Sequence, residues 1–294
     1  MQPPGIDPFT MTADPDAYLG RTASERALAS LERRALQGPA PTVLTGPPGM
    51  GKTLLLRVLE QRLGGRLRCA YLPYSSLPPE GLCAWALEGL GRPAHSNPEA
   101  ALLGVAQEES DAGRGLVLMV DDASHLPLPS ARGIVDLCAE ARGAMRLVLA
   151  ATDGMRTGTL LAALGADAAE VRLSHPMDPS ETRSYVRHRL GRVRVSPSAR
   201  ARFGEEAVAR LHEVSGGVPR SLHRVAGEWL RSGCPETTPA EPLETRRNSR
   251  SPRACDQSES NAIRAGSGHG RRSQPGTPMD QRRRHGDWFP GSGT

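Results

Sequence analysis

The chain has 294 residues, a formal net charge of +5 at neutral pH and only 3% aromatic residues. Such a chain can bury a substantial core, which must rest on leucine, valine and alanine because aromatic side chains are few. It has neither an apolar run of about 18 residues nor the layout of a secretory signal at its start, which argues against membrane and secreted proteins. We predict a soluble, cytoplasmic protein without a membrane span.

The two ends of the chain differ from the rest in composition. Residues 1–10 contain the letters GIDPFT, which we interpret as a vector-derived leader before a natural start at Met11, and we leave them out of the predicted fold. From residue 232 to 294, hydrophobic periodicity stops and Arg, Ser, Gly and Pro dominate. Such a segment cannot bury enough apolar surface to offset its ordering entropy, so we predict a disordered tail.

The first expected helix begins at residues 22–25, whose letters TASE have the spacing of a capping box. Leu28, Leu31 and Ala35 would share one face of this helix, and Gly38 can end it. Short apolar runs then alternate with helical patterns, which is typical of a parallel sheet with crossover helices. Residues 11–175 are therefore predicted to form an α/β domain. Its five expected strands are 41–45, 67–72, 116–120, 146–151 and 170–173.

The loop after the first expected strand carries the pattern GxxxxGK[ST], as GPPGMGKT over residues 46–53. Its glycines let backbone N–H groups surround phosphates, and the helix that follows adds its N-terminal dipole. We predict that Lys52 contacts the β- and γ-phosphates of ATP and that the Thr53 hydroxyl ligates Mg²⁺. The nucleotide-binding residues predicted in this loop are Gly46, Pro47, Pro48, Gly49, Met50, Gly51, Lys52, Thr53 and Leu54.

Lys52 is the only lysine in the chain, and arginine stands at every other Lys or Arg position. A compact ammonium fits inside a phosphate cradle in which a planar guanidinium would clash. The exception therefore supports the interpretation of this loop as a phosphate-binding site.

Two carboxylates follow the apolar strand 116–120, a pattern typical of a Walker B element. We expect Asp121 to hold Mg²⁺ through water. Asp122 takes the position at which many ATPases place a glutamate that polarises the attacking water, so we assign it a catalytic role. Because aspartate is one methylene shorter than glutamate, we expect hydrolysis to be slow or differently arranged.

Two other polar positions are candidates for contact with the phosphates. Thr152 and Asp153 follow the strand 146–151, where they either sense the γ-phosphate or begin a turn. Arg220 falls in the first turn of an expected helix, where the macrodipole disfavours a cation by a few tenths of a kcal/mol. An anionic ligand would relieve that conflict, although an exposed arginine also tolerates so small a cost.

After residue 175 the pattern is purely helical. Asp178 supplies an N-cap, Pro179 the first helical residue and Glu181 a carboxylate at the third position. Further helices are expected near 202–214 and 219–230. We predict a three-helix lid over residues 176–231.

With these motifs in this order, the chain resembles the AAA+ ATPases of the general-secretion-pathway protein A (ExeA-like) group and the related transposition ATPases. The resemblance covers about residues 14–230 and is closest in the lid, at 178–190 and 215–220. It implies a P-loop NTPase fold of the AAA+ kind, a sensor role for Thr152 or Asp153 and a second sensor role for Arg220.

Three features depart from the group's pattern. Asp122 replaces the usual catalytic glutamate, and the segment 164–169 has no arginine where the group would place a finger for a neighbouring subunit. The membrane span and wall-binding region of the secretion members are also missing, which argues against a role at the cell envelope.

Three functions remain open. The first is an ATP-binding ATPase that couples nucleotide state to homo-oligomer assembly or partner binding, with Lys52, Asp122 and Arg220 as catalytic residues. The second is an ATP-dependent DNA-binding regulator, suggested by a tail (231–294) with 11 arginines against seven acidic residues. The third is a signalling switch of the STAND type, whose usual repeat domains are not visible.

The five cysteines are widely scattered, with no CxxC pair and no spacing typical of a zinc site. We predict unpaired thiols in a reducing compartment. They are Cys69, Cys83, Cys138, Cys234 and Cys255.

Overall fold

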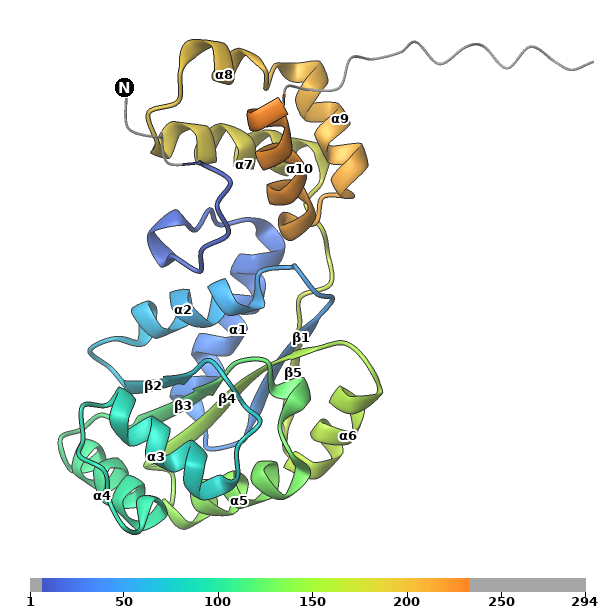
Figure 1. Cartoon of the computed structure of the whole chain (residues 1–294). Helices are drawn as coiled ribbons and strands as arrows, with labels where there is room; N and C mark the ends of the chain where they lie inside the picture. The colour runs from blue at the N-terminus through green and yellow to red at the C-terminus, as the bar shows by residue number, and fades with distance from the viewer. Residues whose placement is uncertain (1–6, 233–294) are drawn as a thin grey trace, which may run out of the picture. The chain divides into compact units, whose positions relative to one another are not determined.

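Five parallel strands form one sheet, in the order β2-β3-β4-β1-β5 (Figure 1). All five expected strands are present, with each end within one residue of the prediction. The strands are β1 (Thr42–Gly46), β2 (Arg68–Leu72), β3 (Leu116–Val120), β4 (Met145–Thr152) and β5 (Ala169–Arg172).

The computed structural model describes residues 7–232, which fall within one compact unit. The predicted tail lies outside the described residues apart from Ser232, as do Cys234 and Cys255. The other three cysteines are unpaired, as predicted.

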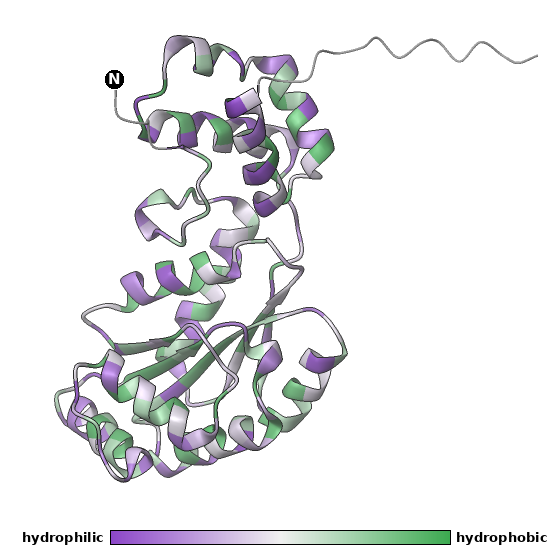
Figure 2. Cartoon of the chain, in the orientation of Figure 1, coloured by the Kyte–Doolittle hydropathy of each residue, from purple (hydrophilic) through white to green (hydrophobic). Residues whose placement is uncertain are grey.

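Helices cover both faces of the sheet. α1 and α2 pack on one face, and α3 to α6 pack on the other (Figure 1). The central strands β1, β3 and β4 are almost entirely buried and mainly apolar, whereas the edge strands β2 and β5 are partly exposed and include charged residues. The middle of the sheet is accordingly mostly green in Figure 2. These helices are α1 (Thr22–Gln37), α2 (Lys52–Leu63), α3 (Pro79–Gly89), α4 (Pro98–Asp111), α5 (Leu128–Glu140) and α6 (Met155–Leu164), with 3₁₀ turns η1 (Pro15–Ala17) and η2 (Ala123–His125).

The start of α1 differs from the predicted capping box. Thr22 is already helical, and the Ser24 hydroxyl instead accepts a hydrogen bond from the Arg21 N–H at 3.2 Å. Glu25, predicted to close the box, forms an ion pair with Arg62 of α2 at 3.0 Å. The expected end at Gly38 is confirmed.

The lid contains four helices, not the three predicted. α7 begins as expected, since the Asp178 carboxylate accepts the Glu181 N–H at 2.7 Å and the Glu181 carboxylate accepts the Asp178 N–H. The helix expected near 202–214 is preceded by a separate short one, which Ser196 caps by accepting the Ala199 N–H. The lid helices are α7 (Pro179–Arg192), α8 (Pro197–Ala201), α9 (Glu205–Ser215) and α10 (Pro219–Ser232).

The lid core also contains Phe9, which the sequence analysis had left out of the fold. Its side chain is only 3% exposed and lies 5.3 Å, ring centre to ring centre, from Phe203. Leaving residues 7–10 out of the fold was therefore wrong, because a large apolar side chain is buried wherever a groove can take it. The vector origin of residues 1–10 stays a prediction.

A buried histidine makes the lid sensitive to acid. Burial lowers the pKa of His223 from 6.5 to about 4, with the Arg189 charge acting in the same direction. Between these pH values the unfolded chain binds more protons than the folded protein. The contribution of neutral His223 to the free energy of unfolding is therefore fully present above pH 6.5. It falls by on the order of 3 kcal/mol as the pH drops to about 4.

This acid sensitivity can be measured by urea unfolding at pH 7 and pH 4.5. We expect His223→Gln to lose less stability between the two pH values than the unmodified chain. His95→Gln, which changes an exposed histidine, should behave as the unmodified chain does. Equal losses in all three proteins would contradict the assignment to His223.

Candidate nucleotide-binding site

A cavity of about 510 Å³ lies where the loop after β1, the ends of β3 and β4 and the start of α10 meet. Gly46 of β1 and Thr152 of β4 are register partners, so the sheet itself brings the loop next to the end of β4. The predicted residues that line the cavity are Pro48, Gly49, Gly51, Lys52, Thr53, Leu54, Asp121, Asp122, Thr152 and Arg220.

Three predicted loop residues do not line the cavity. The Met50 side chain is 3% exposed and belongs to the core beneath α1 and α2. Gly46 and Pro47 face the site only through their carbonyls, which accept hydrogen bonds from Lys52 Nζ at 2.8 and 3.0 Å.

Lys52, the first residue of α2, is the central cation of the site. Burial lowers the pKa of its ammonium, and the Asp153 and Asp121 charges partly offset that effect. The ammonium therefore lies in surroundings that gain from an anionic ligand. Phosphate oxygens are acceptors of the kind that the two loop carbonyls now provide.

The lid contacts the loop directly at Gly49. The Arg220 N–H donates to the Gly49 carbonyl at 3.1 Å, and a Cβ on Gly49 would lie 2.7 Å from the Arg220 Cβ. Gly49 also has a φ of 82°, which favours glycine. The exposed Arg220 guanidinium has no carboxylate partner among residues 7–232, so its charge is available to the cavity.

Asp121 is held in place by two hydrogen bonds at the end of β3. Its side chain accepts from the Tyr71 hydroxyl at 2.8 Å and from the Asp122 N–H at 2.9 Å. The residue is 8% exposed, and the Tyr71 ring in turn packs under the Arg57 guanidinium, 3.3 Å from its centre. The sequence analysis did not identify Tyr71 as a positioning residue.

Asp122 is oriented differently from Asp121. Its φ of 49° is left-handed, which is costly for a residue other than glycine, and the Ser75 hydroxyl donates to its carbonyl at 2.9 Å. Its carboxylate is 60% exposed and contacts His125 Nδ1 at 3.1 Å. Asp122 thus belongs to a carboxylate–imidazole pair, although the sequence predicted Asp122 alone.

The two candidates at the end of β4, Thr152 within the strand and Asp153 just after it, occupy different places. Thr152 lines the cavity, and its N–H donates to the Ser124 hydroxyl at 2.7 Å. The exposed Asp153 donates its N–H to the Gly46 carbonyl at 3.2 Å, and its charge acts on Lys52 more strongly than that of Asp121. Both remain candidates for a sensor of the phosphates.

Several residues that line the cavity were not identified from the sequence. Tyr185 and His223 come from the lid, and their side chains form a hydrogen bond of 2.7 Å to each other. The other residues belong to no recognisable sequence motif and form parts of the cavity wall. They are Met11, Thr12, Ala13, Ala150 and Pro219.

A phosphate ligand would share in holding any magnesium at this cavity. Within residues 7–232 there is no group of three His, Cys, Asp or Glu side chains that could form a metal site. Mg²⁺ is commonly held by one or two carboxylates together with phosphate oxygens. Thr53 and Asp121 fit that arrangement.

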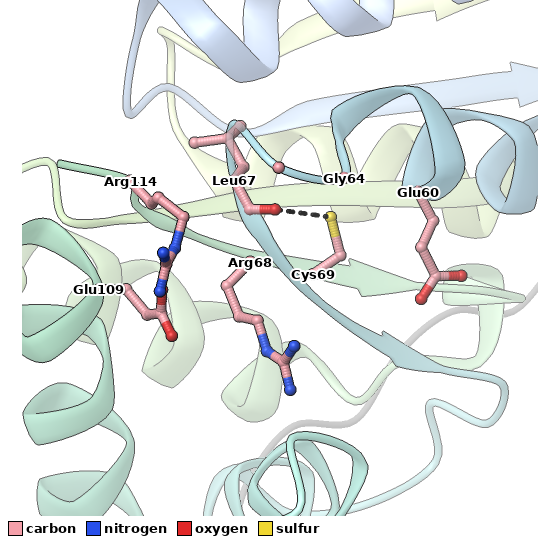
Figure 3. Close-up of a pocket in the computed structure, with 8 residues that line it drawn as sticks. Glu60, Gly64, Leu67, Arg68, Cys69, Glu109 and Arg114 are labelled. Atoms are coloured by element: carbon pink, nitrogen blue, oxygen red, sulfur yellow. Dashed lines mark hydrogen bonds and ion pairs between the residues drawn. The ribbon is translucent and has the colours of Figure 1, made fainter. Parts of the chain in front are cut away.

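A second cavity, of about 480 Å³, lies at the other edge of the sheet, near the start of β2 (Figure 3). Its charges balance, with Arg114 paired to Glu109 at 2.7 Å and with Arg68 and Glu60 nearby. Burial raises the pKa of the Cys69 thiol to about 12, so it is not a reactive nucleophile. This cavity has no feature of a phosphate site.

Comparison with known proteins agrees with the fold. Residues 34–158 match the family model described as an AAA domain. Cdc6p from Pyrobaculum aerophilum superimposes with a TM-score of 0.56 at 16% identity, over 77% of this chain and 65% of that one. The ORC1 protein from Aeropyrum pernix, in complex with DNA, gives a TM-score of 0.50 at 18% identity, over 73% and 62%. The described residues thus have the P-loop AAA+ fold, as predicted.

At the level of sequence, the chain is similar to General secretion pathway protein A of Aeromonas hydrophila. The two are 26% identical over 234 residues, which is 76% of this chain. The chain spans 42% of the length of that relative and less than two thirds of the length of each of the two structures. The sequence similarity to this relative confirms the resemblance inferred from the motifs.

One further observation concerns membranes. No helix in the described part of the chain combines the length and the apolar character needed to cross a bilayer.

Proposed function

We propose that the cavity binds ATP with Mg²⁺ and that nucleotide state controls assembly of the chain or its binding to a partner in the cytoplasm. The observation that carries this proposal is the convergence of Lys52, Asp121, Thr152 and Arg220 on one cavity beside the P-loop. Four positions spread over more than half of the described chain, each from a different element, supply the groups that a triphosphate needs.

In this proposal each residue has a distinct role. Backbone N–H groups of the loop and Lys52 hold the phosphates, while Thr53 and Asp121 hold Mg²⁺, which would neutralise the phosphate charge. Arg220 extends from the lid to the phosphates and links their state to the lid. Asp122, paired with His125, would orient the attacking water, and Thr152 or Asp153 would sense the γ-phosphate.

Measurements of nucleotide binding, hydrolysis and size in solution together test the proposal. We expect the chain to bind ATP in the presence of Mg²⁺ and to hydrolyse it slowly, and its size in solution to differ between ADP and a slowly hydrolysed ATP analogue. Equilibrium titration, phosphate release and light scattering measure these properties. Failure to bind either nucleotide would overturn the proposal.

The role of Asp121 can be tested through Tyr71. Tyr71→Phe removes the 2.8 Å hydrogen bond to Asp121 but keeps the ring beneath Arg57. We expect the Mg²⁺ concentration for half-maximal ATP binding to rise about tenfold, as is usual when a partner of a metal ligand is lost.

Tyr74→Phe is the matched control, since Tyr74 is 54% exposed. We expect it to leave the Mg²⁺ dependence unchanged. A Tyr71→Phe protein with unaltered Mg²⁺ dependence would contradict the positioning role of Tyr71, because the Asp122 N–H would then be enough to hold the Asp121 carboxylate.

DNA binding is a second candidate function. The arginine-rich segment 231–294 favours it, because clustered cations attract the phosphate backbone. A gel-shift titration with and without ATP at several salt concentrations tests it. We expect an ATP-dependent shift that weakens with salt, and the absence of any shift at low salt would exclude this function.

A further inference from the structure

The lid holds a short turn of the chain in a groove of its own. Residues 7–10 form this turn, closed by the Thr10 N–H donating to the Asp7 carbonyl at 3.1 Å. The Asp7 carboxylate accepts the Phe9 N–H at 2.8 Å, which fixes the acidic side chain two positions before the aromatic one. The turn therefore presents Phe9 in a defined orientation.

The groove buries the Phe9 ring among lid residues. The ring lies 5.3 Å from the Phe203 ring and 6.0 Å, edge to face, from the His223 ring. Trp229 of α10 belongs to the same buried cluster. An aromatic ring in such a pocket contributes both apolar burial and favourable ring contacts.

Two lid side chains bind three successive carbonyls of the turn. Arg189 donates from Nε to the Pro8 carbonyl at 2.7 Å and from a terminal nitrogen to the Thr10 carbonyl at 2.9 Å. His223 Nδ1 lies 2.9 Å from the Phe9 carbonyl. A carbonyl only accepts, so Nδ1 donates and Nε2 accepts from the Tyr185 hydroxyl.

Arg189 indicates that the groove is a built site. The residue is 7% exposed and has no carboxylate partner among residues 7–232. A buried guanidinium is costly unless its donors are satisfied, and the two carbonyls of the turn satisfy them. At the rim, Arg231 lies 3.6 Å from the Asp7 carboxylate and matches its charge.

We propose that this lid groove, formed by Arg189, Phe203, His223 and Arg231, is a binding site for a turn of the Asp-x-Phe kind on a partner protein. Residues 7–10 occupy it in this chain. Arg189 and His223 recognise backbone carbonyls, which any sequence supplies, so specificity lies in one acidic and one aromatic side chain. The site is separate from the phosphates, but His223 also lines the nucleotide cavity, so the two can communicate.

A labelled peptide of residues 6–11 tests the proposal on the full chain without nucleotide. We expect fluorescence anisotropy to show binding to the Phe9→Ala chain and much weaker binding to the unmodified chain, in which the tethered turn competes at about millimolar effective concentration. A peptide with alanine in place of phenylalanine should bind at least about tenfold more weakly.

Second-site variants locate the binding. Adding Arg189→Leu to the Phe9→Ala chain should weaken peptide binding at least about tenfold, because two hydrogen bonds from a charged donor are lost. Adding Arg187→Leu, which changes an exposed arginine of the same helix, should not. Equal effects of the two, or no peptide binding to a folded Phe9→Ala chain, would overturn the proposal.

If the Phe9→Ala chain does not fold, a variant that can be cut after folding tests the same proposal. A protease site between Thr10 and Met11 lets the chain fold with Phe9 in place and then releases the turn. Exchange of the cut segment for the labelled peptide supports the proposal. Unfolding of the lid after cleavage, or a cut segment that never exchanges, would show that the turn is a permanent part of the fold.

Discussion

Alanine in place of Lys52 is expected to weaken ATP binding by about a hundredfold. In the structure the ammonium donates to the Gly46 and Pro47 carbonyls, and phosphate oxygens would replace or join these acceptors. Hydrogen bonds to charged groups contribute about 1.5–3 kcal/mol each, so the loss of two weak or one strong bond corresponds to about two orders of magnitude. Isothermal titration in the presence of Mg²⁺ measures the change.

Two controls make this result specific. Arg62→Ala removes a cation from the exposed side of the same helix, where it pairs with Glu25, and should leave ATP affinity almost unchanged. Lys52→Arg keeps the charge but introduces a planar group, and we expect it to fail as the alanine variant does. An ATP affinity that is unchanged by Lys52→Ala would show that the proposed site does not bind the phosphates.

Leu44→Ala is expected to have the largest effect on stability, lowering the free energy of unfolding by about 3 kcal/mol. Leu44 is fully buried in β1, between β4 and β5, and contacts the core beneath α1 and α2. The truncation leaves a cavity that a strand paired on both sides cannot close. Because β1 leads directly into the P-loop, the loss also loosens the support of the nucleotide site.

Urea unfolding measures this loss, with Leu128→Ala as the control. Leu128 is 36% exposed at the start of α5, and its truncation should change stability by less than about 0.5 kcal/mol. Similar losses for both variants would show that the β1 core is less tightly packed than the structure indicates.

The sheet and much of the candidate site could be predicted because their signals are local. Strand β3 is a continuous apolar run and β4 is nearly one, and the loop at 46–53 has its motif in one stretch. Parallel strands end at the same edge, so Asp121 and Thr152 were expected near the loop without knowledge of long-range contacts. The lid start at Asp178 was predicted from its capping pattern for the same reason.

The rest depends on contacts between distant residues, which no local pattern records. In the sequence, Tyr71 is only an aromatic residue in an expected strand. Its role depends on the pairing of β2 with β3, which places Asp121 beside it. Tyr185 and His223 act as a pair only after α7 and α10 pack together. Phe9 was missed for a different reason: its presumed origin decided the prediction, whereas burial depends only on the side chain and the groove.

Because the chain has a single lysine, a lysine-specific protease can cut it at only one bond. An endoprotease that cuts only after lysine has one target, the bond between Lys52 and Thr53, at the first turn of α2. Helical backbone resists cleavage until it opens locally. The rate of this one cut therefore reports how often the phosphate-binding loop comes apart, and any ligand that closes over the loop should slow it.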